Sequence, residues 1–489
     1  MRVRAPLVVL AIVALAGCAA SPCPERPPTR IQFLLVNDVY QLEAVGGRGG
    51  LARVATLARG LRRDTPNTLF ALGGDTLSPS VFSTLFQGRQ MIDAWNALGL
   101  DVAVFGNHEF DFGPAVLRQR MKESRFPWLG ANVLDSVTWR PWSGAQAGLV
   151  REWSHIRVGV VGVTVPHGAR SSNPGPGLVF AHPAESAQRA LADLGALDLR
   201  VGLTHLELEQ DRVLARAVSL DVILGGHDHA PMVETEGRTL IIKAGADAVN
   251  VGQVEYEVGC RAEVLGRRHR LIPVDATVAE APDVTALVAR YQAQADPRLD
   301  RPITELSAPL DSREIVVRRE GAPVGRFIAE IMRRRMGVEV ALINAGAIRG
   351  NRVIPAGPLR LSDVVALLPF ANTVTLLEVD GAVLQASLEH SVDALPRPAG
   401  RFLQTAGLDY VLDAGRPAGR RVLSVSVGGS PLDPARRYRV AVPDFLARGG
   451  DGYSALAGSR TLVSGEDGPG LVEIVIDALE RGTPFVLDR

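Results

Sequence analysis

Five apolar segments of this 489-residue chain end on side chains that are common metal ligands. Short apolar runs that stop at glycine and polar residues are typical of buried strands. The candidate ligands at or just after their ends are Asp38, Tyr40, Asp75, Asn107, His205, His227 and His229. Because the carboxyl ends of strands in an open α/β sheet meet at one rim, we expect these side chains to converge there. Together they suffice for two divalent ions, with Asp75 as the bridging carboxylate.

The order of the expected strands and helices indicates the fold class. Expected strands cover 31–36, 68–72, 100–105, 156–163, 199–203 and 221–224. Expected helices cover 51–63, 89–98, 114–123, 183–194 and 211–218. This alternation favours an α/β domain with a largely parallel sheet. The polar, helix-like segment 276–295 is interpreted as a connector to a second domain.

The start of the chain has the pattern of a targeting segment. Two arginines precede an apolar run over 6–16, which is too short to span a bilayer and is typical of a signal peptide. The run ends on the letters LAGC, which resemble a bacterial lipobox. We therefore expect cleavage before Cys18 and stable anchoring by its lipid chains. The Pro-rich stretch that follows, up to residue 30, is interpreted as an extended tether.

Composition excludes some function classes and leaves others open. The length allows two to four domains of roughly 150 residues each. The formal net charge is zero, so no electrostatic footprint for nucleic acid is present and no nucleic-acid partner is expected. Export permits a disulfide. Because the tether is expected to be mobile, however, Cys23 and Cys260 are both predicted to be free thiols.

The strand-end motifs also carry a family resemblance. They read NDVY (37–40), GGD (73–75), GNHEFD (106–111), THLELEQD (204–211) and GGHDH (225–229). In that order and spacing they resemble the calcineurin-like metallophosphoesterases, and more fully the family of 5′-nucleotidases, UDP-sugar hydrolases and 2′,3′-cyclic phosphodiesterases. The resemblance implies an N-terminal calcineurin-like α/β sandwich, a helical connector and a C-terminal α+β substrate domain. The resulting divisions are a signal peptide (1–17), a tether (18–30), a metallophosphoesterase domain (31–275), a connector helix (276–298) and a substrate-binding domain (299–489).

The resemblance assigns roles to the residues at the strand ends. It implies a first ion on Asp38, Asp75 and His229. It implies a second ion on Asp75, Asn107, His205 and His227. His108, oriented by Asp111, is then not a ligand but the group that stabilises developing charge and assists the leaving oxygen. The implied reaction is attack of a metal-bound hydroxide on phosphorus.

Tyr40 departs from the commoner family pattern, which has histidine at this position. A phenol with an ordinary pKa near 10 binds a metal readily only as phenolate. His229 stands where many relatives have an amide, and it supplies the nitrogen that Tyr40 removes. Two interpretations of Tyr40 remain open, as a ligand or as a wall of the pocket. The metal identity is equally open among Mn, Zn and Fe, and an oxygen-rich site favours Mn or Fe.

The second half of the chain carries the family's substrate signatures. They are NAGAIRG (344–350), LLPFANTV (367–374), GRFLQTAGLDY (400–410) and DFLARGGDGY (444–453). By resemblance Phe370 and Phe445 stack on a nucleobase, which stabilises binding by about 1–3 kcal/mol per stacking partner. Asp451 is expected to hold ribose hydroxyls. The groups expected at the phosphate or sugar end are Arg318, Asn344 and Arg349.

These observations predict an exported, metal-dependent phosphohydrolase that releases phosphate from nucleoside 5′-monophosphates. Alternatives within the family are a UDP-sugar hydrolase, a 2′,3′-cyclic phosphodiesterase and a thiosulfohydrolase. A non-catalytic surface-binding lipoprotein is a remote alternative, because the ligand set is intact. The expected location is the cell envelope, with the enzyme anchored through Cys18 and facing the periplasm or the exterior; Ala19 fits sorting to an outer membrane.

Overall fold

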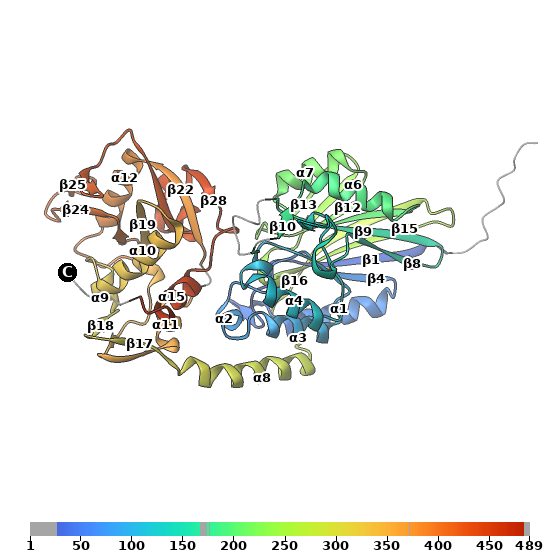
Figure 1. Cartoon of the computed structure of the whole chain (residues 1–489), viewed down its shortest axis with the longest axis horizontal. Helices are drawn as coiled ribbons and strands as arrows, with labels where there is room; N and C mark the ends of the chain where they lie inside the picture. The colour runs from blue at the N-terminus through green and yellow to red at the C-terminus, as the bar shows by residue number, and fades with distance from the viewer. Residues whose placement is uncertain (1–26, 167–173, 176, 371, 484–489) are drawn as a thin grey trace, which may run out of the picture.

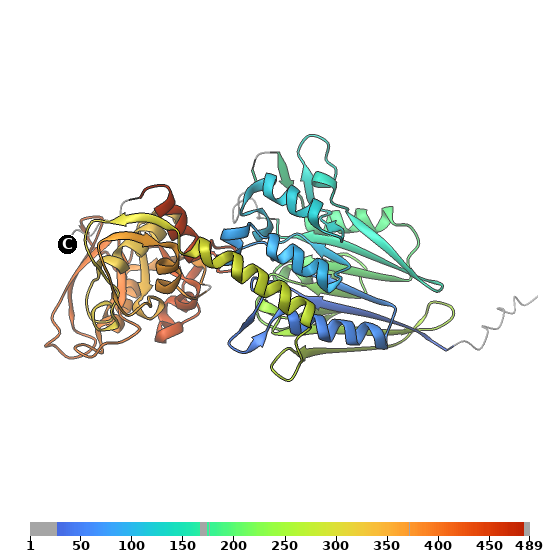
Figure 2. The same ribbon diagram turned by 90° about the horizontal axis from the view of Figure 1, so that it is seen from below.

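The computed structural model describes residues 27–166, 174–175, 177–370 and 372–483. Two domains are joined by the long helix α8 (Pro282–Leu299), which Figures 1 and 2 show running between them. The N-terminal domain is an α/β sandwich of two six-stranded sheets, and the C-terminal domain is a mixed α/β unit around a five-stranded sheet. The predicted fold class is therefore confirmed.

The first sheet of the N-terminal domain has the strand order β16-β15-β1-β4-β5-β6. Its strands are β1 (Thr29–Val36), β4 (Thr68–Leu72), β5 (Val102–Val104), β6 (Trp128–Leu129), β15 (Asn250–Val258) and β16 (Val264–Pro273). Strands β1, β4, β5 and β6 are parallel, whereas β15 pairs antiparallel with β1 and with β16. The carboxyl ends of the four parallel strands consequently share one edge.

The second sheet has the order β13-β14-β12-β11-β9-β8. Its strands are β8 (Gly148–Trp153), β9 (Ile156–Thr164), β11 (Leu199–His205), β12 (Val222–Gly225), β13 (Met232–Glu236) and β14 (Thr239–Lys243). Strands β9, β11, β12 and β14 are parallel, and β8 and β13 are antiparallel edge strands. Parallel strands buried on both faces explain why these segments are almost continuously apolar.

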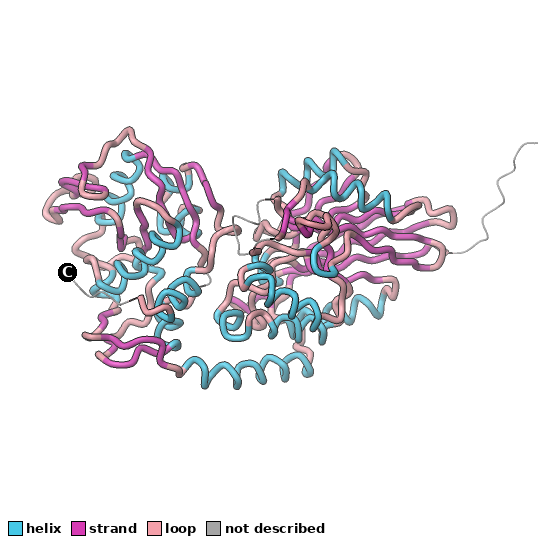
Figure 3. The backbone as a smooth tube through the Cα atoms, viewed as in Figure 1, coloured by secondary structure: helices cyan, strands magenta, loops and turns pink. Residues whose placement is uncertain are grey.

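The two sheets pack face to face and helices cover their outer faces (Figures 1 and 3). Phe33, Val160 and Leu203 belong to the buried core between the sheets. The covering helices are α1 (Leu51–Asp64), α3 (Arg89–Leu98) and α4 (Gly113–Glu123) on the first sheet, and α6 (Pro183–Asp193) and α7 (Leu208–Ala217) on the second. In α1 the buried residues recur at helical spacing from Leu51 to Ala58, which gives the helix one apolar face.

Short elements complete the N-terminal domain. They are α2 (Val81–Phe86), β2 (Ala44–Val45), β3 (Arg48–Gly49), β7 (Val133–Asp135), β10 (Leu178–Phe180) and the 3₁₀ turns η1 (His108–Phe110), η2 (Trp142–Gly144) and η3 (Ala246–Ala248). Helix α8 is fastened to this domain, because the Tyr291 hydroxyl donates to Asp93 Oδ2 at 2.6 Å and the Tyr291 ring meets Phe86 edge-on. The guanidinium of Arg298 lies over the same Phe86 ring.

The C-terminal domain is built on the sheet β23-β19-β27-β22-β28. Its strands are β19 (Val340–Asn344), β22 (Val374–Asp380), β23 (Leu403–Ala406), β27 (Arg437–Pro443) and β28 (Arg460–Val463). The main helices are α10 (Pro323–Met336), α12 (Gly381–Val392) and α15 (Leu471–Glu480). One hydrophobic cluster joins this sheet and these helices, so the domain has a core of its own.

Smaller elements carry much of the rest of the C-terminal domain. The short strands are β17 (Pro302–Leu306), β18 (Leu310–Asp311), β20 (Val353–Ile354), β21 (Gly357–Arg360), β24 (Leu408–Leu412), β25 (Val422–Val427) and β26 (Ser430–Pro431). The short helices are α9 (Glu314–Val317), α11 (Leu361–Leu367), α13 (Asp444–Ala447) and α14 (Ser454–Ala457), with the 3₁₀ turns η4 (Ala345–Ala347) and η5 (Gly450–Gly452).

One prediction about the cysteines is wrong. Cys260 is disulfide-bonded, and its partner lies outside the described residues. Cys23, which was also expected to be free, and the expected lipidation site Cys18 fall outside the described residues as well. Among the helices of the described part of the chain, none is long and apolar enough to cross a membrane.

Candidate metal centre and substrate cluster

The candidate ligands lie on turns at the carboxyl ends of the parallel strands of both sheets. Asp38 follows β1, Asp75 follows β4 and His227 follows β12, and all three have positive φ angles of 54°, 55° and 73°. Non-glycine residues in this region are strained, and such strain is often found at functional sites. Glycine makes the close approach of the turns feasible, because a Cβ on Gly106 would lie 2.0 Å from Asp75 Oδ1.

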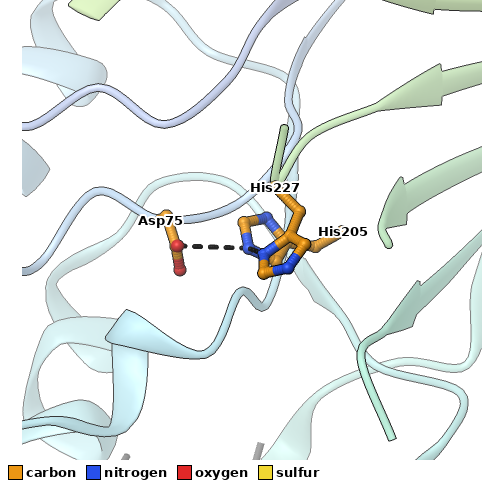
Figure 4. A group of neighbouring side chains, drawn as sticks. All are labelled: Asp75, His205 and His227. Atoms are coloured by element: carbon orange, nitrogen blue, oxygen red, sulfur yellow. Dashed lines mark hydrogen bonds and ion pairs between the residues drawn. The ribbon is translucent and has the colours of Figure 1, made fainter. Parts of the chain in front are cut away.

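Asp75, His205 and His227 form the centre of the cluster (Figure 4). His205 Nε2 lies 3.1 Å from Asp75 Oδ2 and 3.2 Å from His227 Nδ1. It also lies 3.1 Å from Asn107 Oδ1. The opposite nitrogen of His205, Nδ1, lies 2.8 Å from the carbonyl of Gly73, to which it donates. A hydrogen bond of this kind fixes the tautomer and aims the other nitrogen at a metal.

The electrostatics of this cluster fit a cation. The Asp75 side chain is fully buried, and its Oδ2 faces His205 Nε2 at 3.1 Å. Burial by itself would lower the pKa of His205, but Asp75 and Asp38 raise it to about 9. Burial and the neighbouring His205 lower the pKa of His227 well below its usual value. Carboxylate oxygens and imidazole nitrogens therefore face one small volume. This combination of oxygen and nitrogen donors suits Mn, Fe or Zn.

Asp38, Tyr40 and His229 form an adjoining group. The Tyr40 hydroxyl lies 3.1 Å from His229 Nε2 and 3.4 Å from Asp38 Oδ1. His229 Nε2 lies 3.6 Å from the same Asp38 oxygen. Burial, followed by the charges of Asp38 and Asp75, raises the pKa of Tyr40 well above its usual value. The protein alone thus disfavours a phenolate, and ligation by Tyr40 needs the charge of a bound ion to offset this effect.

His108 stands beside the cluster with both ring nitrogens facing oxygen atoms. Nδ1 lies 2.7 Å from Asp111 Oδ2, and Nε2 lies 2.8 Å from the backbone carbonyl of Glu466. Burial would lower the pKa of His108, but Asp111 and Asp75 raise it well above its usual value. The backbone N–H of His108 donates to Asp75 Oδ1 at 2.8 Å, which connects this residue to the metal cluster.

The candidate substrate residues form a second cluster, in the C-terminal domain. Asn344 Nδ2 donates to Asp451 Oδ2 at 2.8 Å. The guanidinium of Arg349 lies 5.2 Å from the centre of the Phe370 ring. Arg318 and Arg349 both approach one carboxylate oxygen of Glu314, at 2.8 and 3.4 Å.

Two features of this cluster favour a ligand. Phe370 and Phe445 are 43% and 39% exposed, so part of each side chain is accessible to a ligand. Several polar atoms are buried without a hydrogen-bond partner among the described residues, namely Arg318 Nε, Asn344 Oδ1 and Arg349 Nε. Buried polar atoms are normally paired, so these three suggest a group that the protein itself does not supply. Figure 1 shows α9, which leads into Arg318, on the side of its domain turned away from the N-terminal domain.

The comparisons with known proteins cover both clusters. Residues 31–231 match the calcineurin-like phosphoesterase family, and residues 302–458 match the 5′-nucleotidase C-terminal domain. The crystal structure of a 5′-nucleotidase precursor from Thermus thermophilus is 31% identical, with a TM-score of 0.58, over 92% of this chain and 96% of that chain.

This chain belongs to the 5′-nucleotidase family.

Other relatives agree with this family assignment. The 5′-nucleotidase of Vibrio cholerae is 27% identical over 98% of this chain and 96% of its own length. The structure of the NAD nucleotidase of Haemophilus influenzae has a TM-score of 0.76 at 21% identity, over 93% of this chain and 97% of that chain, which supports the fold. As a 5′-nucleotidase family member, the chain is a metal-dependent phosphoester hydrolase.

Sequence analysis missed one buried carboxylate beside this nucleotidase centre. Glu109 accepts backbone hydrogen bonds from Asp75, Thr76 and Gly106, at 2.9, 2.7 and 2.5 Å. It therefore joins the turn after β4 to the turn after β5. Burial and the charge of Asp75 raise the pKa of Glu109 to about 7. Its position inside GNHEFD was the only available signal, because a sequence does not reveal which backbone donors a carboxylate meets.

The C-terminal domain also reaches the metal cluster, through the loop Ser464–Asp467. The carbonyl of Glu466 accepts from Asn107 Nδ2 at 3.0 Å as well as from His108 Nε2. A carboxylate oxygen of Asp467 lies within 4.8 Å of a ring nitrogen of His227 and of a carboxylate oxygen of Glu207. A cleft of about 1040 Å³ is lined by His227, Glu207 and this loop. No motif in the sequence indicated this contact between the domains.

Proposed function

We propose that the chain hydrolyses nucleoside 5′-monophosphates and related nucleotides at a two-metal centre. The observation that carries the proposal is the fully buried Asp75 carboxylate, which lies with His205 and His227 in one small group of possible ligand atoms and has the Asn107 amide oxygen nearby. A bridging carboxylate beside two imidazoles and an amide is a suitable donor set for divalent ions. The exposed aromatic rings of the second domain favour a substrate that carries a base.

The proposed ligands divide between two ions. Asp38, Asp75 and His229 would hold one ion, and Asp75, Asn107, His205 and His227 would hold the other. Bound divalent ions clamp phosphate oxygens and lower the pKa of water toward neutrality. His108 holds a proton at Nε2 and directs it to the leaving oxygen, while Asp111 fixes the ring through Nδ1.

The substrate cluster would bind the rest of the nucleotide. Phe370 and Phe445 stack on the base, and Asp451 accepts hydrogen bonds from ribose hydroxyls. Arg318, Arg349 and Asn344 bind the phosphate or sugar end, and their orphaned polar atoms support this role. Since this cluster and the metal cluster lie in different domains, turnover requires a movement that makes them face each other.

Tyr40 has two possible roles at the first metal site, as a metal ligand or as a wall of the pocket. Its hydroxyl is close enough to Asp38 and His229 to share an ion with them, and the same geometry suits a hydrogen-bonding pocket wall. Metal analysis of a Tyr40→Phe enzyme separates the two roles. Full occupancy and activity assign Tyr40 to the pocket wall, whereas loss of one ion makes it a ligand.

Measurement of phosphate release from AMP with Mn²⁺, with and without EDTA, tests the proposed function. UDP-glucose, 2′,3′-cyclic AMP and a thiosulfonate ester serve as competing substrates. Preferred turnover of AMP that EDTA stops is the expected result. Preference for another ester would support the two-metal centre but contradict the proposed substrate. Metal-independent turnover would refute both the metal centre and the proposed function.

We also propose that the enzyme is exported and anchored at Cys18. The lipobox-like LAGC and the short apolar run before it support this location. Expression of the full chain in a bacterium, followed by membrane fractionation, tests it. The native chain should be found with membranes, and Cys18→Ser should release it; a Cys18→Ser chain that stays with the membrane would contradict the anchor.

A further inference from the structure

Lys243 is a fully buried lysine at the end of β14, behind the metal cluster. Its ammonium lies 2.8 Å from Asp211 Oδ2 and 2.7 Å from Asp228 Oδ2. It also donates to the backbone carbonyls of Leu206 and Gly226, at 2.5 and 2.7 Å. Four oxygen atoms from three different segments thus surround one cation.

The positions of these oxygens in the chain connect Lys243 to the candidate ligands. Leu206 directly follows His205, and Gly226 directly precedes His227. Asp228 lies between His227 and His229. One ammonium group therefore holds the backbone next to His205 on β11 and the backbone next to His227 after β12.

Asp211 extends the same network to the other side of His205. Its Oδ1 accepts a hydrogen bond from the Thr204 hydroxyl at 2.7 Å, while its Oδ2 faces Lys243. Thr204 directly precedes His205, so both neighbours of this ligand are bonded to Lys243 either directly or through Asp211. Gly225 leaves room for the side chain, because a Cβ there would lie 3.1 Å from Lys243 Cε.

The charge of this lysine is well supported by its surroundings. Burial alone would lower its pKa, but Asp211 and Asp228 raise it above the usual value. A cation that is paired and hydrogen-bonded on all sides has little freedom to move. The hydrogen bonds and ion pairs of Lys243 join it to the backbone and carboxylates of the two loops, so its effect on the spacing of the ligands passes through these loops. Its positive charge also acts directly on His227.

We propose that Lys243 is a positioning residue that sets the spacing between His205 and His227 for metal binding. The inference rests on the proposed two-metal function and adds a residue to it. Groups that orient metal ligands from outside the coordination sphere typically change metal affinity by about 10–100-fold when they are removed. A buried ion pair with a purely structural role would affect folding and leave the affinity of the folded protein unchanged.

The matched experiment uses the only two lysines of the chain. Lys243→Met removes the ammonium, and Lys122→Met removes the exposed lysine of α4 as the control. Metal-free full-length proteins are titrated with Mn²⁺ and Co²⁺, the Co²⁺ absorption spectrum is recorded, and thermal unfolding is measured without metal. The expected result is a roughly 10–100-fold weaker affinity and an altered Co²⁺ spectrum for Lys243→Met, with both unchanged for Lys122→Met.

A second variant keeps the test decisive if Lys243→Met does not fold. Lys243→Met combined with Asp211→Asn removes the buried carboxylate that the first change leaves unpaired. A folded double variant with weak metal binding supports the positioning role. Native affinity in either folded variant overturns it, and so does binding lost only in proportion to unfolding. Absence of metal binding by the native chain would instead refute the proposed function itself.

Discussion

The two candidate clusters of this nucleotidase differ in how completely the protein assembles them. The candidate metal ligands Asp38, Asp75, Asn107 and His205 are fully buried and lie at strand ends of two packed sheets. The candidate stacking residues, Phe370 in a loop and Phe445 in the short helix α13, keep much of their surface exposed. In the proposed function the metal centre is therefore preorganised, whereas substrate binding would be completed by a movement of the domains.

Metal removal gives the largest expected effect and tests the first half of this comparison. EDTA should abolish phosphate release from AMP, and added Mn²⁺ should restore it, because the proposed mechanism relies on bound ions to clamp the phosphate oxygens. Phosphate release before and after dialysis, with metal content measured in parallel, checks this. Activity that persists in metal-free protein would remove the centre from the mechanism.

The next largest effect is expected from His108→Ala. Loss of the proton donor should lower kcat by roughly 10²–10⁴-fold with metal content unchanged. Asp111→Asn should have a smaller effect, because the ring stays in place but loses the carboxylate that orients it. His155→Ala, which changes an exposed histidine outside both clusters, is the matched control. A native kcat in His108→Ala would show that this ring takes no part in the reaction.

Changes to the aromatic residues test the second half of the comparison. Phe445→Ala and Phe370→Ala should each raise KM for AMP by roughly tenfold or more, since stacking stabilises binding by about 1–3 kcal/mol per base. Turnover of p-nitrophenyl phosphate, which has no nucleobase, should change much less. Steady-state kinetics on both substrates measure the contrast. An equal loss on both would mean that the rings support the fold rather than the base.

The smallest expected effect concerns stability where the domains meet. Burial, together with the charge of Asp111, raises the pKa of Glu473 on α15 to about 7 from its usual 4.5. The folded protein then holds a proton that the unfolded chain has lost, so the free energy of unfolding falls as pH rises from about 4.5 to 7.

Glu473→Gln removes this pH dependence. The variant should be more stable than the native protein at about pH 8, by ~1–3 kcal/mol, and equally stable at about pH 4. Thermal unfolding at both pH values measures the difference. A variant destabilised under the alkaline condition would show that the ionised carboxylate is favourable at this position.

The sequence predicted the candidate metal ligands better than the buried residues that hold their loops in place. Asp75 and His205 were predictable because each ends an apolar strand, and parallel strands must meet at one edge. Glu109 and Lys243 were not, because their partners, backbone groups for Glu109 and both backbone groups and carboxylates for Lys243, are brought near only by the folded chain. The expectation of a free Cys260 failed because it relied on the mobility of the tether.

The substrate cluster was located from motifs, but its placement relative to the metals was not. The motif around Phe370 and the motif around Phe445 indicate residue types suited to a nucleotide. Domain orientation depends on contacts between surfaces, such as the one between Glu466 and His108, and these have no periodic pattern in a sequence. The resemblance therefore predicted the residues of the substrate cluster, but not how the two domains are oriented.

The Glu466 carbonyl occupies hydrogen-bond donors that the proposed substrate would use. One backbone oxygen already accepts hydrogen bonds from Asn107 and from His108. In the proposed reaction, a phosphoryl oxygen would accept from the same two donors and take the place of this carbonyl with nearly the same number of hydrogen bonds. The loop would then withdraw as the phosphate ester binds. Asn107 and His108 would keep a hydrogen-bond acceptor throughout this exchange.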